Sequence, residues 1–203
     1  MKTNKLAFRL FKLFPLVLAG ALLGGCAAPM SKTSKYMTVA SNVPTAPPAG
    51  KALVCIHRPK AFWGHPLYTK IWDGTNFIAD LGNCHSVAYV CEPGLHYFMN
   101  TSAQAEGCVE AQLLPDKTYD LRTETITSTL IVSFKIKPIQ QNAEERQQVA
   151  EWTRKNRWVE PGPRASAFVQ NEKEQNDIRQ LIEDFTSGKR HDKLQHLAAD
   201  DHR

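Results

Sequence analysis

Five cysteines are the residues of this chain best suited to chemistry, and they divide into one and four. Cys26 ends the run Leu23-Gly24-Gly25-Cys26, after a basic start and an apolar stretch that begins near Leu13. A positive region, a short apolar region and small residues before a cleavage point are typical of a secretory signal peptide. The apolar stretch of about 13 residues is shorter than the roughly 20 that a membrane span needs. We therefore expect residues 1–25 to be a signal peptide.

The other four cysteines predict two disulfide bonds, because an even number of cysteines in an exported chain usually pairs. Cys55, Cys84, Cys91 and Cys108 allow three pairings. On one strand, Cys84 and Cys91 would lie roughly 23 Å apart and on opposite faces, whereas a disulfide needs Cα atoms about 4.4–6.8 Å apart. In a meander, Cys108 would open its strand at the level of Cys84. We therefore favour the pairs Cys84–Cys108 and Cys55–Cys91.

The spacing of the other polar residues predicts neither a metal site nor a catalytic one. His57, His85 and His96 lack the Cys-x-x-Cys and His-x3-5-His spacings of zinc ligands. Ser86 stands beside His85, but no acidic partner for a triad can be assigned from the sequence. The motifs of hydrolases, nucleotide-binding loops and zinc proteases are absent as well. We expect no cofactor and no enzymatic activity.

A cluster of aromatic residues, Phe62, Trp63, Tyr68 and Trp72, allows two interpretations. The favoured one is packing in the core and in a hairpin. Because Phe62 and Trp63 precede Gly64-His65-Pro66, they belong to a loop, and loops often carry recognition residues. Phe62, Trp63, His65 and Tyr68 therefore form a possible recognition loop.

The segment that ends at Cys26 resembles the lipobox of bacterial lipoproteins. The resemblance implies that the mature chain begins with an acylated Cys26 that anchors it in a membrane. Ala27 is not the Asp that retains enteric lipoproteins in the inner membrane, so the resemblance implies the outer membrane and its periplasmic face. The expected partners are the membrane, through the acyl chains, and a protein of the cell envelope.

The charge of the mature chain argues against nucleic acid as a partner. The whole chain has 25 Lys and Arg against 20 Asp and Glu, and its formal net charge is +5. Four basic residues and no acidic ones precede Cys26, which leaves 21 against 20, or +1. The excess of positive charge therefore leaves with the signal peptide.

The mature chain divides into four segments by composition. Residues 26–50 are rich in Pro, Ser, Thr and Ala and predict a flexible tether after the lipidated Cys26. Residues 51–138 predict a β-sandwich domain, residues 139–187 a two-helix extension, and residues 188–203 a polar, disordered tail. In the extension, Ile178, Leu181, Ile182 and Phe185 form an amphipathic stripe that either covers the sandwich, which we favour, or docks a partner.

The β-domain is expected to hold about eight short strands between turns. Asp73-Gly74, Pro93-Gly94 and Pro115-Asp116-Lys117 are turn sequences, and each is followed by a returning apolar stretch. The strand that ends the domain alternates apolar and polar residues from Thr129 to Lys137, the pattern of a sheet with one buried face. Short strands at regular spacing predict an antiparallel sandwich or barrel.

The same domain resembles a family of bacterial lipoproteins whose β-domain has no assigned activity. The matching pieces are Ala52-Leu53-Val54-Cys55-Ile56-His57-Arg58-Pro59, Asp73-Gly74, Pro93-Gly94-Leu95-His96 and Asp116-Lys117-Thr118-Tyr119. The resemblance implies an immunoglobulin-like or prealbumin-like sandwich of about 7–8 strands and does not extend beyond Pro138. We therefore expect a non-catalytic binding or scaffolding module of the cell envelope. The alternative is a protein that handles a small ligand or metal with the Cys- and His-bearing face of the sandwich.

Overall fold

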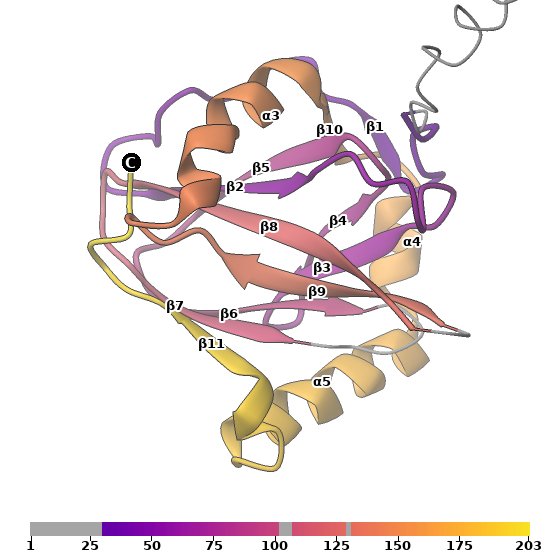
Figure 1. The fold of residues 1–203 in the computed structure, drawn as a ribbon. Helices are drawn as coiled ribbons and strands as arrows, with labels where there is room; N and C mark the ends of the chain where they lie inside the picture. Colours follow the sequence, from indigo (N-terminus) through magenta and orange to yellow (C-terminus); the bar gives the residue numbers. More distant parts are fainter. Residues whose placement is uncertain (1–29, 102–106, 129–130) are drawn as a thin grey trace, which may run out of the picture.

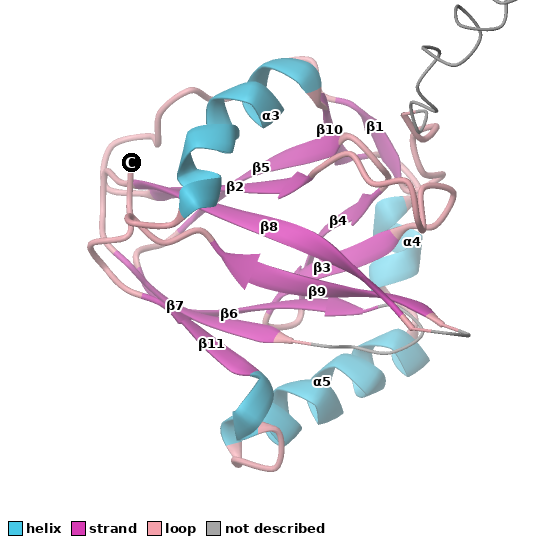
Figure 2. Cartoon of the chain, viewed as in Figure 1, coloured by secondary structure: helices cyan, strands magenta, loops and turns pink. Residues whose placement is uncertain are grey.

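The protein is mainly β and has two stacked sheets with helices on their outer faces (Figures 1 and 2). The computed structural model describes residues 30–101, 107–128 and 131–203. The predicted signal peptide and the lipidation site Cys26 lie outside the described residues. Among the described residues, no helix has the length and apolar character that would let it cross a membrane.

Each sheet is a mixture of parallel and antiparallel pairs. Sheet I has the order β1 (Met37–Val39), β10 (Arg157–Pro161), β5 (His85–Cys91), β2 (Ala52–Arg58), β8 (Thr118–Thr127) and β9 (Val132–Pro138). Sheet II has the order β11 (Leu194–Leu197), β7 (Cys108–Leu113), β6 (Gly94–Thr101), β3 (Thr69–Asp73) and β4 (Asn76–Leu81).

The eight strands expected between residues 51 and 138 are present as β2 to β9, so the prediction of a mainly β domain is confirmed. The prediction that they are all antiparallel is wrong, because the pairs β2–β8, β5–β10 and β7–β11 are parallel. Among the described strands, β3–β4, β6–β7 and β8–β9 pair as antiparallel neighbours in sequence. After β2, β4, β5 and β7 the chain passes to the other sheet. A turn sequence predicts where a strand ends, but it does not determine which strand the following strand will pair with.

The core lies between the sheets and is built from alternate residues of each strand. Val54 and Ile56 of β2 meet Ile71 of β3 and Phe98 of β6 there, and all four side chains are fully buried. Because the outer faces of both sheets also carry apolar residues, each face needs a cover.

Helix α5 (Glu172–Thr186) and the short helix α4 (Ala165–Val169) cover the outer face of sheet II. The stripe of α5 contacts Trp72 of β3 through Ile178, and Met99 of β6 through Leu181 and Phe185. The side chain of Asn171 accepts hydrogen bonds from the first turn of α5 and so caps it. The sheet, rather than a partner, therefore covers the stripe.

Sheet I is covered by a 3-10 turn (η1, Glu144–Gln148) that continues into α3 (Val149–Lys155) (Figure 2). Between the helices the chain forms β10, which the sequence analysis did not anticipate. The extension therefore contributes a strand to sheet I as well as covers for both faces.

The expectation of a flexible tether over residues 26–50 is wrong for its described part. Strand β1 pairs with β10, and Met37 is buried against the core. Before β1, the hydroxyls of Ser31 and Ser34 make hydrogen bonds to the loop after β2 and to Asp80 of β4. Short hydroxyl side chains can thus fix a segment that has few apolar residues of its own. We call residues 30–39 the N-terminal strap.

The expectation of a disordered tail over residues 188–203 is also wrong. Strand β11 pairs in parallel with β7, and Leu197 reaches the core. A 3-10 turn (η2, His191–Lys193) precedes it, and the backbone N–H of Arg203 donates to the carbonyl of Thr118 in β8. The free edge of β7 supplies the hydrogen bonds that a four-residue strand cannot supply itself.

Candidate functional site

The four cysteines expected in disulfides are free, buried thiols, so both predicted pairs are wrong. On the paired strands β2 and β5, Cys55 lies opposite Ala88 and Cys91 lies opposite Ala52. Three residues therefore separate Cys55 and Cys91 along the strands, roughly 10 Å, which is beyond the reach of a disulfide.

The other predicted pair is separated by the sandwich itself. Cys84 precedes β5 of sheet I, whereas Cys108 begins β7 of sheet II and contacts Leu181 and Phe185 of α5. A meander, which the sequence analysis assumed, would have placed Cys84 and Cys108 side by side. The chain instead crosses between the two sheets, so the two cysteines lie in different layers.

The thiols are also unsuited to metal or nucleophilic chemistry at neutral pH. Burial raises the pKa of Cys55 to about 11 and the pKa values of Cys91 and Cys108 to about 12. A thiol must be ionised to attack or to bind a metal. Throughout the described part of the chain, no group of three or more His, Cys, Asp and Glu side chains is arranged to share a metal ion.

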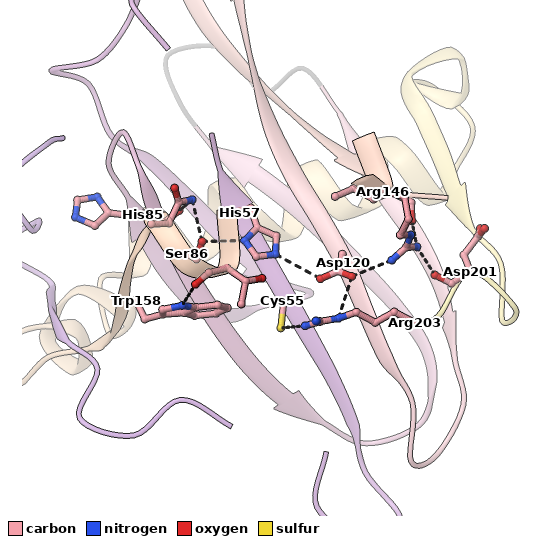
Figure 3. A network of polar contacts seen from close by, with 12 residues as sticks. Cys55, His57, His85, Ser86, Asp120, Arg146, Trp158, Asp201 and Arg203 are labelled. Carbon is pink, nitrogen blue, oxygen red and sulfur yellow. Dashed lines mark hydrogen bonds and ion pairs between the residues drawn. The ribbon is translucent and has the colours of Figure 1, made fainter. Parts of the chain in front are cut away.

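A buried polar network lies on the outer face of sheet I, beneath α3 (Figure 3). Its centre is Asp120 of β8, whose carboxylate accepts hydrogen bonds from Nη1 of Arg146 at 2.9 Å and lies 3.2 Å from Nε of Arg203. His57 of β2 lies between Asp120 and Ser86, with its Nε2 3.4 Å from Asp120 and its Nδ1 2.9 Å from Ser86 Oγ. We call this set the Asp120 network.

The strand registers explain how the network forms. His57 is the direct partner of Ser86 across β2 and β5, and Asp120 is the partner of Cys55 across β2 and β8. Three neighbouring strands thus present polar side chains on one face. The extension completes the network, because Asn156 after α3 donates to Ser86 Oγ at 3.0 Å.

The order Ser86–His57–Asp120 resembles the triad of serine hydrolases, but its geometry does not allow that chemistry. All three residues are 0 % exposed, and the rings of Trp152 and Trp158 lie within 6 Å of the His57 ring. A substrate therefore has no route to the Ser86 hydroxyl. The network instead fastens α3 and the C-terminus to sheet I.

Sequence reasoning missed Asp120 as the acidic partner, although one signal was available. Asp120 stands between Tyr119 and Leu121 in the middle of a strand, where a carboxylate is rare unless it is paired. The ring of His85, the histidine next to Ser86 in sequence, points away from the network (Figure 3), and only its backbone carbonyl is involved, as an acceptor from Asn156 at 3.3 Å.

A second polar cluster lines a pocket of about 330 Å³ at the end of the sandwich where β3 meets β4. Asp73 accepts hydrogen bonds from Nδ1 of His96 at 2.7 Å and from the Tyr89 hydroxyl at 3.1 Å. Nε2 of His96 lies 2.8 Å from the carbonyl of Glu92, so both ring nitrogens face acceptors. The hydrogen bond to Asp73 raises the pKa of His96. Cys91 lines the same pocket.

The predicted aromatic cluster is divided by the structure. Trp72 lies in the interior, as the core interpretation expects, whereas Phe62 and Trp63 are 56 % and 65 % exposed. Their rings meet edge to face at 5.3 Å. The Tyr68 hydroxyl donates to the carbonyl of Lys32 in the N-terminal strap. We call residues 59–68, between β2 and β3, the aromatic loop.

The aromatic loop is held rigidly although its tip is exposed. The buried guanidinium of Arg58 donates to the carbonyls of Gly64 and Leu67 in the loop and of Leu81 at the end of β4. Ser31 Oγ donates to the carbonyl of His65 at 2.5 Å. Gly64 has a φ of +71°, and a Cβ there would meet Val132 of β9 at 2.8 Å, so only glycine fits. The loop therefore presents Phe62 and Trp63 in one fixed arrangement.

Comparison of the sequence with models of known protein families and with curated proteins finds no match. The function is therefore inferred from the sequence and the geometry together. Three features carry that inference: the closed Asp120 network, the pocket of His96 and Asp73, and the exposed aromatic loop beside the N-terminal strap.

Proposed function

We propose that this chain is a lipoprotein, anchored by Cys26 at the periplasmic face of the outer membrane, that acts as a non-catalytic binding or scaffolding module of the cell envelope. The lipobox Leu23–Cys26 supports the anchor. The carrying observation is that the chain becomes part of the folded domain at Ser31, five residues after Cys26. A rigid domain joined so closely to an anchor suits a module that works at the membrane surface.

The non-catalytic part of the proposal is supported by the Asp120 network. The Ser–His–Asp order is present among the described residues, but it is closed over by α3 and Trp158. Its contacts join the extension to the sheet, which is a structural task.

We further propose that the sandwich is of the prealbumin-like type, one of the two types that the family resemblance implies. In the immunoglobulin type, the first two strands of the domain share a sheet. Here β2 lies in sheet I between β5 and β8, and β3 lies in sheet II. The orders β5–β2–β8–β9 and β4–β3–β6–β7 therefore favour the prealbumin-like type and, with it, the resemblance to the lipoprotein family.

The test of the anchor is the mass and location of the mature protein. We expect the mature chain to begin at an acylated Cys26 and to fractionate with outer membranes. The Cys26→Ala variant is expected to lose both properties. A mature protein without acyl chains, or a variant that still fractionates with membranes, would contradict the proposal.

The test of the module is crosslinking in cells, followed by purification of the lipidated protein and of Cys26→Ala. We expect one envelope protein to be recovered in stoichiometric amount with the lipidated form and to be weakened or lost with the variant. Recovery of no partner would favour the alternative below.

The alternative function is the handling of a small ligand at the pocket of His96, Asp73 and Cys91. The specific observation in its favour is that an imidazole with two acceptors, a carboxylate and a thiol share one pocket of about 330 Å³. A thermal-shift screen with small polar molecules tests it. A ligand of this pocket should raise the melting temperature of the wild type but not of His96→Gln.

A further inference from the structure

We propose that the end of the sandwich that carries the aromatic loop lies against the membrane in which Cys26 is anchored, with Phe62 and Trp63 inserted at the lipid headgroup level. This inference rests on the proposed lipid anchor and adds to it an orientation and a lipid-binding surface. The occupant to which it commits is the lipid bilayer itself.

The first support is the length of chain between the anchor and the fold. Ser31 is fixed at this end, because its backbone N–H donates to the carbonyl of Asn83 and its hydroxyl accepts from the Asn83 N–H and donates to the His65 carbonyl. Ser31 is the fifth residue after Cys26, and a fully extended chain of that length spans at most about 18 Å. The anchor is therefore tethered within about 18 Å of Ser31, at the end of the sandwich that carries the aromatic loop.

The second support is the distribution of exposed apolar side chains. Met30, Phe62, Trp63 and Leu67 are exposed on the strap and the loop. Ile131, also exposed, directly precedes β9, and the start of β9 lies beside the loop because Gly64 packs closely against Val132. In Figure 1 the start of the described chain, the loop after β2 and the adjoining ends of β8 and β9 are all found on the right of the molecule. Tryptophan is enriched at membrane–water interfaces, because its ring is largely apolar and its indole N–H is polar.

The third support is charge. Lys32, Lys35 and Lys60 are exposed beside the apolar residues. Residues 30–36 and 59–68 contain no Asp or Glu. A surface that combines basic and aromatic side chains matches anionic lipid headgroups. Because Arg58 and Ser31 hold the loop in place, its insertion requires little ordering of the chain.

The orientation has a consequence for the other end of the molecule. Strand β2 begins at Ala52, opposite Cys91, and ends at Arg58, opposite His85. The loop after β2 and the turn after β5 are therefore at opposite ends of sheet I. Docking of the aromatic loop would point the pocket of His96 away from the membrane, where envelope partners or small molecules can reach it.

The experiment uses the full-length, lipidated protein reconstituted into vesicles of phosphatidylethanolamine and phosphatidylglycerol that carry doxyl-labelled lipids. Doxyl groups quench the fluorescence of tryptophan that lies within the bilayer interface. We expect quenching in the wild type and its loss in Trp63→Phe, which would assign the signal to Trp63. Phe62→Ser retains Trp63 but should weaken the quenching, because the apolar tip is smaller. Leu95→Ser is the matched control, since Leu95 is 56 % exposed like Phe62 but lies near the other end.

The outcomes separate this inference from the proposed anchor. Intact mass first establishes whether Cys26 is acylated, and an unacylated protein would remove the anchor and this inference together. With an acylated, vesicle-bound protein, absence of quenching at Trp63 would overturn the inference and leave the anchor standing. Equal effects of Phe62→Ser and Leu95→Ser would also overturn it. A photocrosslinker placed at Phe62 in cells that captures a protein in stoichiometric yield would assign the loop to a protein partner instead.

Discussion

Asp120 is the residue at which the C-terminal extension meets the sandwich. Its carboxylate is completely buried and receives two guanidinium groups, from Arg146 before α3 and from Arg203 at the C-terminus. Both segments are distant from β8 in sequence. A single buried anion thus replaces the apolar contacts that these polar segments lack.

Replacing that carboxylate by an amide should destabilise the whole fold. In Asp120→Asn, the guanidinium groups of Arg146 and Arg203 remain beside a neutral amide. Removal of one partner of a buried ion pair costs about 3–5 kcal/mol of folding free energy. Urea unfolding measures the change in the free energy of unfolding. Glu124→Gln is the matched control, because its ion pair with Lys137 is partly exposed to solvent and should contribute less than about 1 kcal/mol. Equal effects of the two variants would show that the Asp120 network does not fasten the extension.

His96 should make stability depend on pH in a defined direction. The hydrogen bond to Asp73 raises its pKa in the folded protein. Its stabilising contribution is therefore complete below the ordinary histidine pKa of about 6.5 and is lost as pH rises through the raised value. His85 acts in the opposite direction, because burial lowers its pKa. The contribution of His96 is therefore measured as the difference in the free energy of unfolding between the wild type and a variant that lacks only His96.

We expect the free energy of unfolding of wild type minus that of His96→Gln to decrease as pH rises from about 5 to 9. Urea unfolding at several pH values measures it. Titration of the His96 ring by NMR supplies an independent check of the raised pKa. A difference that is constant over this range would contradict the imidazolium–carboxylate pair with Asp73.

Among the secondary-structure elements, β11 shows how a short polar segment can contribute to the stability of the sandwich. It covers the edge of β7 and carries Leu197, which is buried in the core. The Tyr119 hydroxyl donates to the carbonyl of Ala199 just after it. The segment is held by its neighbours, since nothing in its own composition would order it.

Leu197→Ala should destabilise the protein by about 2–5 kcal/mol, the usual cost of truncating a buried leucine. Leu114→Ala is the control, because Leu114 is exposed and its loss should have little effect. Thermal unfolding of both variants tests the comparison. If residues 188–203 were disordered, as their composition alone predicts, Leu197→Ala would lower the melting temperature no more than Leu114→Ala does.

At the scale of the whole molecule, the fold is held together without crosslinks. Cys55, Cys84, Cys91 and Cys108 are free, buried thiols, although the proposed location is oxidising. Burial limits the access of oxidants to them, and the strand positions of the two predicted pairs do not allow those disulfides. The two sheets, the strap and the extension therefore depend on packing, hydrogen bonds and the Asp120 network.

The purified mature protein should react with four equivalents of a thiol reagent when it is unfolded without reductant, one at each of these cysteines. In the native state the reaction should be slow, because all four side chains are buried. The melting temperature should not change when reductant is added. Fewer than four reactive thiols in the unfolded protein would reveal a disulfide that this structure lacks.

The sequence by itself determined strands β2 to β9 and the turns that end several of them. Alternating apolar residues and the turns at Asp73-Gly74, Pro93-Gly94 and Pro115-Asp116-Lys117 predicted β2 to β9, because these signals act over a few residues. The amphipathic stripe of α5 is local in the same sense, and it was predicted as well.

Only the tertiary structure decided which strands are neighbours, where the cysteines lie and what the polar segments do. Strand β2 joins β8, more than sixty residues later, and no local signal specifies that choice. Strands β1, β10 and β11 form because other strands offer them an edge. The Asp120 network gathers residues from β2, β5, β8, η1, the end of α3 and the C-terminus, and the buried carboxylate of Asp120 depends on the two guanidinium groups that these later segments supply. These features depend on contacts between residues far apart in the sequence, and the composition of a single segment does not determine such contacts.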